Sequence, residues 1–267
     1  MATQIHPHAV VDPSAQLGED VVVGPFAIIG ADVQLGDRCQ VEPHAVVAGP
    51  SHFGSENRFF SHCSVGSDPQ DKKFSGEPTY LEVGDRNHFR EFCTVNRGTV
   101  GGGGRTTMGS DNLMMAYSHV AHDCHVGNEV VFANSGTLAG HVDVGDFAAI
   151  GAFCAVHQFC KVGRYAYLGG FTVATKDVLP FSLTVGQRAA CVGLNKIGLQ
   201  RRGFTGEEVK ALDRAYKTLL HSKLNTTQAL EALREGERTS AIDELIEFVE
   251  TSERGVVKAA RGGRRGG

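Results

Sequence analysis

The densest group of side chains that could do chemistry lies in the run SHVAHDCHVG, at residues 118–127. Its polar members include His119, His122, Asp123 and His125. An imidazole titrates near neutral pH and can take a proton from a substrate hydroxyl group, so the run is a candidate for general-base chemistry. The elements that carry the run decide which of these imidazoles can face one reacting atom.

A six-residue repeat carries the run. Between Ile5 and Ala174 the chain divides into 26 hexads that all begin with an apolar residue, with interruptions at residues 71–82 and 101–107. The first residue is usually a branched aliphatic one, which suits a short buried strand. The second is Gly in 13 of the 26 hexads, which suits a tight bend at positive φ. Six of the seven cysteines occupy the small fifth position, which predicts inward packing rather than metal ligands, nucleophiles or disulfides.

Three hexads make one coil of 18 residues with three flat sides, and stacked coils form a prism of parallel strands. Residues 18 apart in the sequence then lie above one another. This register brings His122, His141 and His157 near one edge, with Gly140 directly over His122. The stacked group predicts a reaction site that offers a base, a polar binding group and a free backbone N–H.

The hexad pattern resembles the left-handed parallel β-helix of the hexapeptide-repeat acyltransferases. Four runs resemble one family of them, the acyl-ACP–UDP-N-acetylglucosamine O-acyltransferases: HVAHDCHVGN, LAGHVDVGD, AVHQFCKVG and GQRAACVGLNKIGLQRRGF. The segments SDPQDKKFSGEPTYLEVGDRN and RGTVGGGG match the two places where that family leaves its prism. The resemblance covers about residues 5–250 and implies an enzyme of the first step of lipid A synthesis in Gram-negative bacteria.

The implied reaction moves an (R)-3-hydroxyacyl group from an acyl carrier protein thioester to the 3-hydroxyl of UDP-N-acetylglucosamine. The resemblance makes His122 the general base, with Asp123 orienting its imidazole, and makes the Gly140 N–H the donor to the thioester oxyanion. It assigns contacts with the sugar, the acyl chain and the nucleotide to Gln70, Asp71, Lys73, His141, His157, Gln158, Asn195 and Arg202. One departure is Ile197, where the family has a Glu, and this departure affects the uracil contacts.

The resemblance also implies a homotrimer with active sites between subunits. Gly170 falls on a different face of the prism from the stacked histidines, so a cleft that uses both needs a second chain. Gly170 matches the family's acyl-length ruler, and because it lacks a side chain we expect a donor near fourteen carbons. The acidic carrier protein would meet a basic patch of Lys161, Arg164, Lys176 and Arg201. No cofactor and no metal are expected beyond the carrier's phosphopantetheine.

The domain organisation follows from where the hexads stop. We expect a mainly β fold, with a left-handed parallel β-helix of eight or nine coils over residues 1–180. An irregular connection at 181–204 leads to an α-helical domain at 205–254. A capping box at Thr205 and Glu208 begins that domain, and further helices are predicted at 227–235 and 240–252. The tail at 255–267 is predicted to be disordered.

Composition excludes several classes of protein. The net charge of −4 argues against nucleic-acid binding, and no apolar run reaches the ~18 residues of a membrane span. The first residues lack the features of a signal peptide, so we expect a cytoplasmic protein.

Three alternatives stay open. One is an acyltransferase of the same fold that uses another nucleotide sugar or a small amine, and another is a non-catalytic scaffold. The third is a zinc enzyme resembling the γ-class carbonic anhydrases. The three closely spaced histidines of the run 118–127 argue against it, because bending and alternation in a strand-rich repeat splay them apart.

Overall fold

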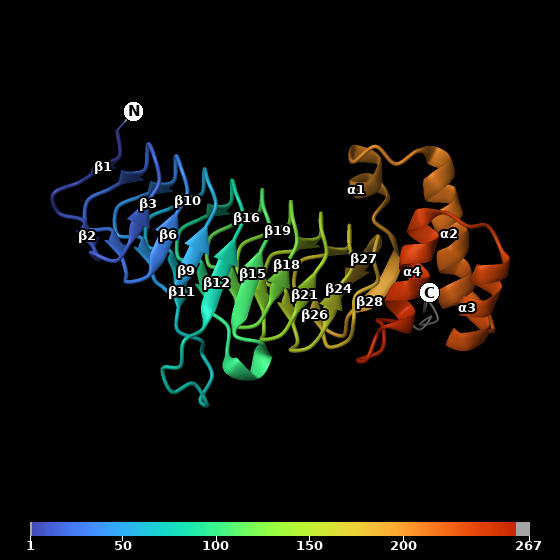
Figure 1. Cartoon of the computed structure of the whole chain (residues 1–267). Helices are drawn as coiled ribbons and strands as arrows, with labels where there is room; N and C mark the ends of the chain where they lie inside the picture. Colours follow the sequence, from blue (N-terminus) through green and yellow to red (C-terminus); the bar gives the residue numbers. More distant parts are fainter. Residues whose placement is uncertain (1, 260–267) are drawn as a thin grey trace, which may run out of the picture.

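The computed structural model describes residues 2–259, and its main body is a three-sided prism (Figure 1). Three sheets form its sides, and the chain visits them in constant rotation from β1 to β26. The path of the ribbon in Figure 1 is left-handed, so the prism is the predicted left-handed parallel β-helix. The register pairs residues 18 apart, as in His119 with Thr137 and His125 with Asp143. The 18-residue coil predicted from the hexads is therefore present.

We name the sheets A, B and C in the order in which the chain meets them. Sheet A contains β1 (Gln4–Ile5), β4 (Val22–Val23), β7 (Gln40–Val41), β10 (Arg58–Phe59), β13 (His88–Phe89), β16 (Leu113–Met114), β19 (Val131–Phe132), β22 (Ala149–Ile150), β25 (Tyr167–Leu168), β27 (Ser182–Val185) and β28 (Ala190–Leu194). Sheet B contains β2 (Val10–Val11), β5 (Ile28–Ile29), β8 (Val46–Val47), β11 (Ser64–Ser67), β14 (Thr94–Asn96), β17 (His119–Val120), β20 (Thr137–Leu138), β23 (Ala155–Val156) and β26 (Val173–Ala174). Sheet C contains β3 (Gln16–Leu17), β6 (Val33–Leu35), β9 (Ser51–Phe53), β12 (Tyr80–Val83), β15 (Arg105–Met108), β18 (His125–Val126), β21 (Asp143–Val144) and β24 (Lys161–Val162). The chain turns from one sheet to the next along three edges, which we call A/B, B/C and C/A.

Apolar first residues of the hexads fill most of the prism interior, together with the small fifth residues, whereas Ile5 of the first coil is exposed. Phe59 and Phe89 are fully buried, and their rings stack with centroids 5.2 Å apart. The cysteines are free and buried, as predicted for packing residues. Burial raises the pKa of the Cys124 thiol to about 12, so this neighbour of Asp123 carries no thiolate at neutral pH.

Most glycines at the second position of the hexads do not have the positive φ that the sequence predicts, and they are needed for another reason. Gly18 and Gly36 do not have positive φ; a Cβ on Gly36 would lie 2.6 Å from the Gly54 carbonyl carbon in the next coil. The second-position glycines therefore let successive coils approach each other. Among the 13 second-position glycines only Gly66 has positive φ. Elsewhere positive φ belongs to non-glycine residues two positions later, such as Asp20 and Asp123. The sequence does not mark these positive-φ positions, because the stacked coils fix the turn and hold a left-handed backbone there without Gly.

Both interruptions of the repeat occur at the B/C edge. The chain leaves the prism at 68–79, between β11 and β12, and at 97–104, between β14 and β15. Each departure begins about three residues before the loss of hexad phase at 71–82 and 101–107. The second one contains a short 3-10 helix, η1 (Val100–Gly102). Figure 1 shows both excursions on the same side of the prism.

The segment 181–204, predicted to be irregular, is ordered. β27 continues sheet A as a parallel strand beside β25, and β28 pairs with β27 in the antiparallel sense. Helix α1 (Lys196–Arg201) follows, on the opposite side of the prism from the excursions (Figure 1). Here the backbone donors and acceptors at the end of sheet A find partners after the hexads stop.

Three helices close this end of the molecule: α2 (Gly206–His221), α3 (Thr226–Glu235) and α4 (Ser240–Glu250). Thr205 and Glu208 form a capping box on α2. The buried Tyr216 hydroxyl donates to the Pro180 carbonyl, and Arg164 pairs with Glu244 at 2.8 Å, so the helices are bound to the prism. None of the helices within residues 2–259 is long and apolar enough to cross a membrane.

The start of the predicted disordered tail is packed against the fold. Val256 and Val257 are buried, and Val256 bridges to Asp177. The Cys191 N–H donates to the Lys258 carbonyl at 3.0 Å. Two buried valines and these backbone bonds offset the conformational entropy lost on ordering. The rest of the predicted tail, from residue 260, lies outside the described residues.

Candidate active site

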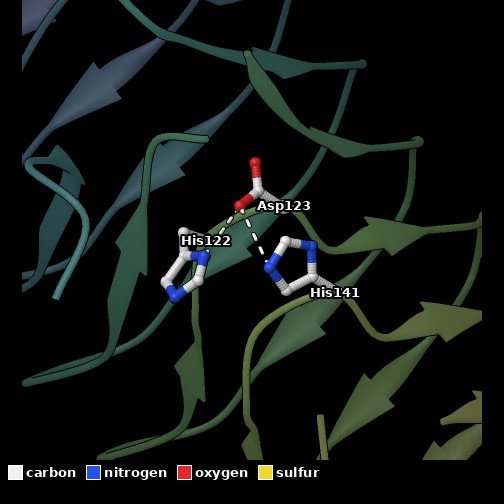
Figure 2. A group of neighbouring side chains, drawn as sticks. All are labelled: His122, Asp123 and His141. Carbon is white, nitrogen blue, oxygen red and sulfur yellow. Dashed lines mark hydrogen bonds and ion pairs between the residues drawn. The ribbon is translucent and has the colours of Figure 1, made fainter. Parts of the chain in front are cut away.

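The B/C edge brings His122, Asp123 and His141 together, and Figure 2 shows their side chains. His122 and Asp123 occupy the turn between β17 and β18, and His141 occupies the turn one coil further on. The 18-residue register places His141 over Asp123, so its ring lies beside the carboxylate. The stacking of the coils thus brings together three side chains that a single strand would separate.

The three side chains form a chain of polar contacts through one oxygen. His122 Nδ1 lies 2.7 Å from Asp123 Oδ2, a hydrogen bond, and His141 Nε2 lies 3.6 Å from the same oxygen. The Asp123 side chain is fully buried, whereas those of His122 and His141 are 15% and 25% exposed. If His122 Nδ1 carries the proton that Asp123 accepts, Nε2 keeps its lone pair and can accept a proton.

Gly140 lies directly against His122, as the register predicts. A Cβ on Gly140 would lie 2.6 Å from Cε1 and 2.9 Å from Nε2 of the His122 ring. Among residues 2–259, no acceptor takes the Gly140 N–H. A free N–H beside a base is the arrangement that oxyanion stabilisation requires.

Thr99, which no sequence motif marks, also holds the Asp123 carboxylate. Its backbone N–H donates to Oδ1 and its hydroxyl to Oδ2, both at 2.7 Å. Asp123 has no salt bridge with Lys or Arg in the described part of the chain, so neutral donors and the two imidazoles surround its carboxylate. The sequence signal was faint: the family match covered RGTVGGGG as a segment and gave no role to its threonine.

Burial keeps two neighbouring histidines neutral. It is the main reason why the pKa of His141 lies below its usual value, although the Asp123 and Asp71 charges act in the opposite direction. The pKa of His119 is lowered by burial first and by His122 second. His119 Nδ1 also lies 2.7 Å from the Thr94 hydroxyl. Both rings are therefore neutral polar groups beside His122 at pH 7.

A metal ion is the other chemistry that this cluster could support. One ligand atom from each of His122, Asp123 and His141 lies within 4.8 Å of the others. Zinc would bind such atoms at about 2.0–2.1 Å. Both Asp123 oxygens already accept hydrogen bonds from Thr99, and Oδ2 also contacts His122, so an ion would have to displace these donors. This donor set fits a hydrogen-bonded acid–base pair better than a metal site.

The excursion residues singled out from the sequence lie at the same edge. Gln70, Asp71 and Lys73 belong to the excursion 68–79 at the B/C edge. The Lys73 N–H donates to Asp71 Oδ1 at 3.0 Å. The negative charge of Asp71 is close enough to His141 to act on its pKa, in the upward direction. Gln70 and Lys73 are exposed and can meet a ligand.

His157 and Gln158 lie at the B/C edge one coil beyond His141. His157 Nδ1 contacts the Gln158 carbonyl at 3.1 Å and the Arg254 guanidinium at 3.3 Å. Phe159 stacks on His141 with ring centroids 4.5 Å apart. The histidine column predicted from the sequence is therefore extended by an aromatic ring rather than by a direct contact between His157 and His141.

Asn195 and Arg202 lie elsewhere, at a cavity of about 750 Å³ beside α1. Asn195 caps α1, and Arg202 pairs with Glu129 at the C/A edge and lies over the Phe147 ring at 4.7 Å. Ile197 also lines this cavity and is 66% exposed. One chain does not bring this cavity to His122, because the B/C and C/A edges border opposite sides of sheet C.

Gly170 lies at the third edge, A/B, between β25 and β26. A Cβ there would meet only the Ala152 carbonyl oxygen, at 3.4 Å. The neighbouring Phe171 is 62% exposed and stacks on Phe153, so it does not fill the space at Gly170.

The four basic residues assigned to a carrier-protein patch have different surroundings. Arg164 pairs with Glu244, and the Lys161 ammonium donates to the Thr251 carbonyl at 3.1 Å. Both residues thus also fasten the helical domain to the prism. Lys176 and Arg201 are exposed.

Known sequences and structures resemble this chain over nearly its full length. The family described as "Udp N-acetylglucosamine O-acyltransferase; Domain 2" matches residues 177–257, and "Bacterial transferase hexapeptide (six repeats)" matches residues 14–49. The acyl-[acyl-carrier-protein]–UDP-N-acetylglucosamine O-acyltransferase of Stenotrophomonas maltophilia R551-3 is 50% identical over 259 residues. That match covers 96% of this chain and 98% of the relative.

Solved structures agree with this match. LpxA from Acinetobacter baumannii superposes with a TM-score of 0.93 at 39% identity, covering 95% of this chain and 99% of its own. The UDP-N-acetylglucosamine acyltransferase of Francisella novicida also gives 0.93, at 33% identity, covering 97% of this chain and 95% of its own.

Proposed function

Since the chain belongs to the acyl-[acyl-carrier-protein]–UDP-N-acetylglucosamine O-acyltransferase family and is an acyltransferase, we propose that it acylates the sugar 3-hydroxyl of UDP-N-acetylglucosamine. The donor is an (R)-3-hydroxyacyl thioester on acyl carrier protein, and the reaction is the first step of lipid A synthesis. The observation that carries the proposal is the contact of the His122–Asp123 pair with the backbone of Gly140.

The chemistry needs one base and one oxyanion donor. His122 Nε2 takes the proton of the 3-hydroxyl as its oxygen attacks the thioester carbon. The negative charge that develops on the carbonyl oxygen accepts the Gly140 N–H. When the intermediate collapses, the C–S bond breaks, and the His122 imidazolium returns its proton to the departing thiolate. The products are the 3-O-acylated nucleotide sugar and a free carrier-protein thiol.

Substrate contacts complete the proposal. Asp71, Lys73, Gln70 and His141 would bind the sugar and the start of the acyl chain, since they share the B/C edge with His122. His157 and Gln158 extend that edge towards the nucleotide. The cavity with Asn195 and Arg202 would take the nucleotide, because Arg202 can turn from Glu129 to a diphosphate. Ile197 would contribute only an apolar contact there.

A homotrimer would unite these residues. The outward residues of sheet C are polar, for example Gln16 and Gln34, whereas sheets A and B expose Val22, Ile28 and Val10. Packing sheet B of one subunit against sheet A of the next buries the apolar sides and leaves sheet C in water. The B/C edge of one chain then lies near the C/A edge of its neighbour.

The A/B edge would lie at the threefold axis of such a trimer. Its exposed rings stack in a continuous row with centroids 5.0 to 5.5 Å apart: His8, Phe26, His44, His62, Phe92 and Tyr117. Gly170 belongs to the same edge, so an acyl chain that runs inward from His122 would end beside it. This arrangement supports Gly170 as the acyl-length ruler.

The carrier protein and the cellular location belong to the same proposal. The acidic carrier would be attracted by Lys161, Lys176 and Arg201. Arg164 would contribute less, because its ion pair with Glu244 offsets part of its positive charge. The reaction needs no cofactor, because the acyl group arrives activated as a thioester on phosphopantetheine. A cytoplasmic location follows from this choice of donor.

One assay tests the proposal. The protein is incubated with 3-hydroxyacyl carrier proteins of several lengths, with UDP-N-acetylglucosamine, with its 3-amino analogue, or with neither. We expect thiol release that depends on a nucleotide sugar, and a product whose mass increases by one 3-hydroxyacyl group. Thiol release without a nucleotide sugar, or no release with any donor, would contradict the proposal. Assays with and without EDTA exclude or reveal a metal requirement.

A further inference from the structure

The second excursion covers the carboxylate of Asp123. Thr99 is the N-cap of its 3-10 helix η1, and the backbone of Gly102 in η1 lies directly against the Asp123 carboxyl group. On the prism side, the Asp123 N–H donates to the Thr106 hydroxyl at 2.8 Å. The Asp123 side chain is consequently fully buried, although it belongs to an edge turn.

Thr99 makes three of the contacts that fix this arrangement. Its N–H donates to Asp123 Oδ1, and its hydroxyl donates to Oδ2, the oxygen that also contacts His122 Nδ1. The same hydroxyl accepts the Gly102 N–H at 3.2 Å, which closes η1 over the carboxylate. Two donors on two oxygens fix both the position and the plane of the carboxylate.

Gly102 must be glycine for this cover to close. A Cβ there would overlap the carboxyl group of Asp123. The adjacent Gly101 is different, because its Cβ would meet only the Thr99 hydroxyl oxygen, at 3.9 Å. Neither glycine has positive φ, so backbone strain does not separate the two positions. The close approach at Gly102 keeps water away from the carboxylate.

We propose that Thr99 is a positioning residue for the reaction, acting through Asp123 on the His122 imidazole. Gly102 supports this role because, without a side chain, it lets η1 close over the Asp123 carboxylate. The inference rests on the proposed role of His122 as the base. Without the Thr99 hydroxyl the carboxylate can rotate away from His122 Nδ1, and the imidazole loses the partner that fixes its orientation. A base displaced by about 1 Å can lose about a hundredfold in rate.

The main experiment compares Thr99→Val, which removes the hydroxyl but keeps the shape, with Thr99→Ser, which keeps the hydroxyl. We expect Thr99→Val to lower kcat about tenfold to a hundredfold while KM for both substrates changes less than about twofold. Thr99→Ser should restore most of kcat. Wild-type kcat in Thr99→Val, or an equal loss in Thr99→Ser, would overturn the proposal.

A double-mutant cycle shows whether Thr99 acts through Asp123. In an Asp123→Asn background, adding Thr99→Val should change kcat less than about twofold, because the connection is already broken. An undiminished second loss would mean that Thr99 acts independently. His122→Ala measured alongside separates the two hypotheses: if it stays active, the proposed base is wrong, whereas if it is inactive and Thr99→Val is normal, only the role of Thr99 is wrong.

The two neighbouring glycines give a matched pair that does not depend on Thr99. Gly102→Ala should lower kcat as Thr99→Val does, and Gly101→Ala should leave it within about twofold of wild type. Thermal unfolding of all variants reports folding, and kcat is compared among those whose midpoints agree. Equal activity of the two alanine variants would contradict the proposed role of Gly102 in covering the Asp123 carboxylate, whether or not Thr99→Val folds.

Discussion

The backbone of Gly140 lies against the imidazole of His122, one coil apart along the B/C edge. The gap is so small that a Cβ on residue 140 would lie 2.6 Å from His122 Cε1. These residues are 18 apart in the sequence, and the stacking of hexads alone makes them neighbours. The geometry allows one reacting carbonyl group to be near both the base and a backbone N–H.

We therefore predict that Gly140→Ala lowers kcat about a hundredfold, because the new methyl group must displace the imidazole from its position. Gly206→Ala is the control, since a Cβ there meets nothing within 4 Å. Steady-state kinetics and thermal unfolding of both variants test the prediction. A Gly140→Ala enzyme with normal kcat would mean that the ring position is irrelevant to catalysis.

His122→Ala should lose nearly all turnover and stay folded. A general base contributes about 10²–10⁴-fold, and the ring lies at the B/C edge, outside the hydrophobic core of the prism, so its removal leaves no core cavity. His125→Ala is the matched control, because that ring is exposed on sheet C and contacts the Thr107 hydroxyl. Retention of more than about a tenth of wild-type kcat in His122→Ala would disprove its role.

Truncation of Asp71 and Lys73 to alanine should raise KM for UDP-N-acetylglucosamine more than KM for the carrier protein. Both residues lie on the excursion 68–79, which shares the B/C edge with His122. Lys72→Ala is the control, because it removes a charge from the same exposed stretch. Equal effects on the two KM values would argue against a sugar-binding loop.

The wild-type protein should prefer 3-hydroxymyristoyl over 3-hydroxydecanoyl carrier protein. Each buried methylene contributes about 0.8 kcal/mol, so four of them favour the longer donor by about 3 kcal/mol, or roughly a hundredfold. Gly170→Met should reverse the order of kcat/KM, and the open space around Gly170 allows it without damage to the prism. A ten-carbon preference in the wild type would assign the ruler to another residue.

Charges on sheets A and B should dissociate the trimer that we propose. Val22→Glu with Ile28→Glu places carboxylates on apolar exposed positions of these sheets, and we expect both sedimentation mass and activity to fall. Gln16→Glu with Gln34→Glu adds the same charge on sheet C and should keep a mass about three times 28.5 kDa. If the sheet C variant dissociated instead, the proposed packing would be wrong.

The sequence determined the prism and the stacking at its B/C edge. A solenoid repeats one local rule, so a period of six with an apolar first residue fixes the sheets, the core and the neighbours 18 residues apart. For this reason Gly140 could be placed over His122 and the cysteines could be assigned to the core. The same regularity explains why positive φ is the wrong prediction for most of these glycines: a sequence shows where Gly recurs, but not whether it serves φ or close packing.

Only the tertiary structure decided what lies outside the repeat. The contact of Thr99 with Asp123 joins residues 24 apart across an excursion that follows no period, so its closure depends on the folded path of η1. The strands within 181–204 and the packed residues 255–259 likewise form by pairing with a sheet that must already exist. Periodic burial is encoded locally and can be read from the sequence, whereas these contacts depend on surfaces that folding first creates.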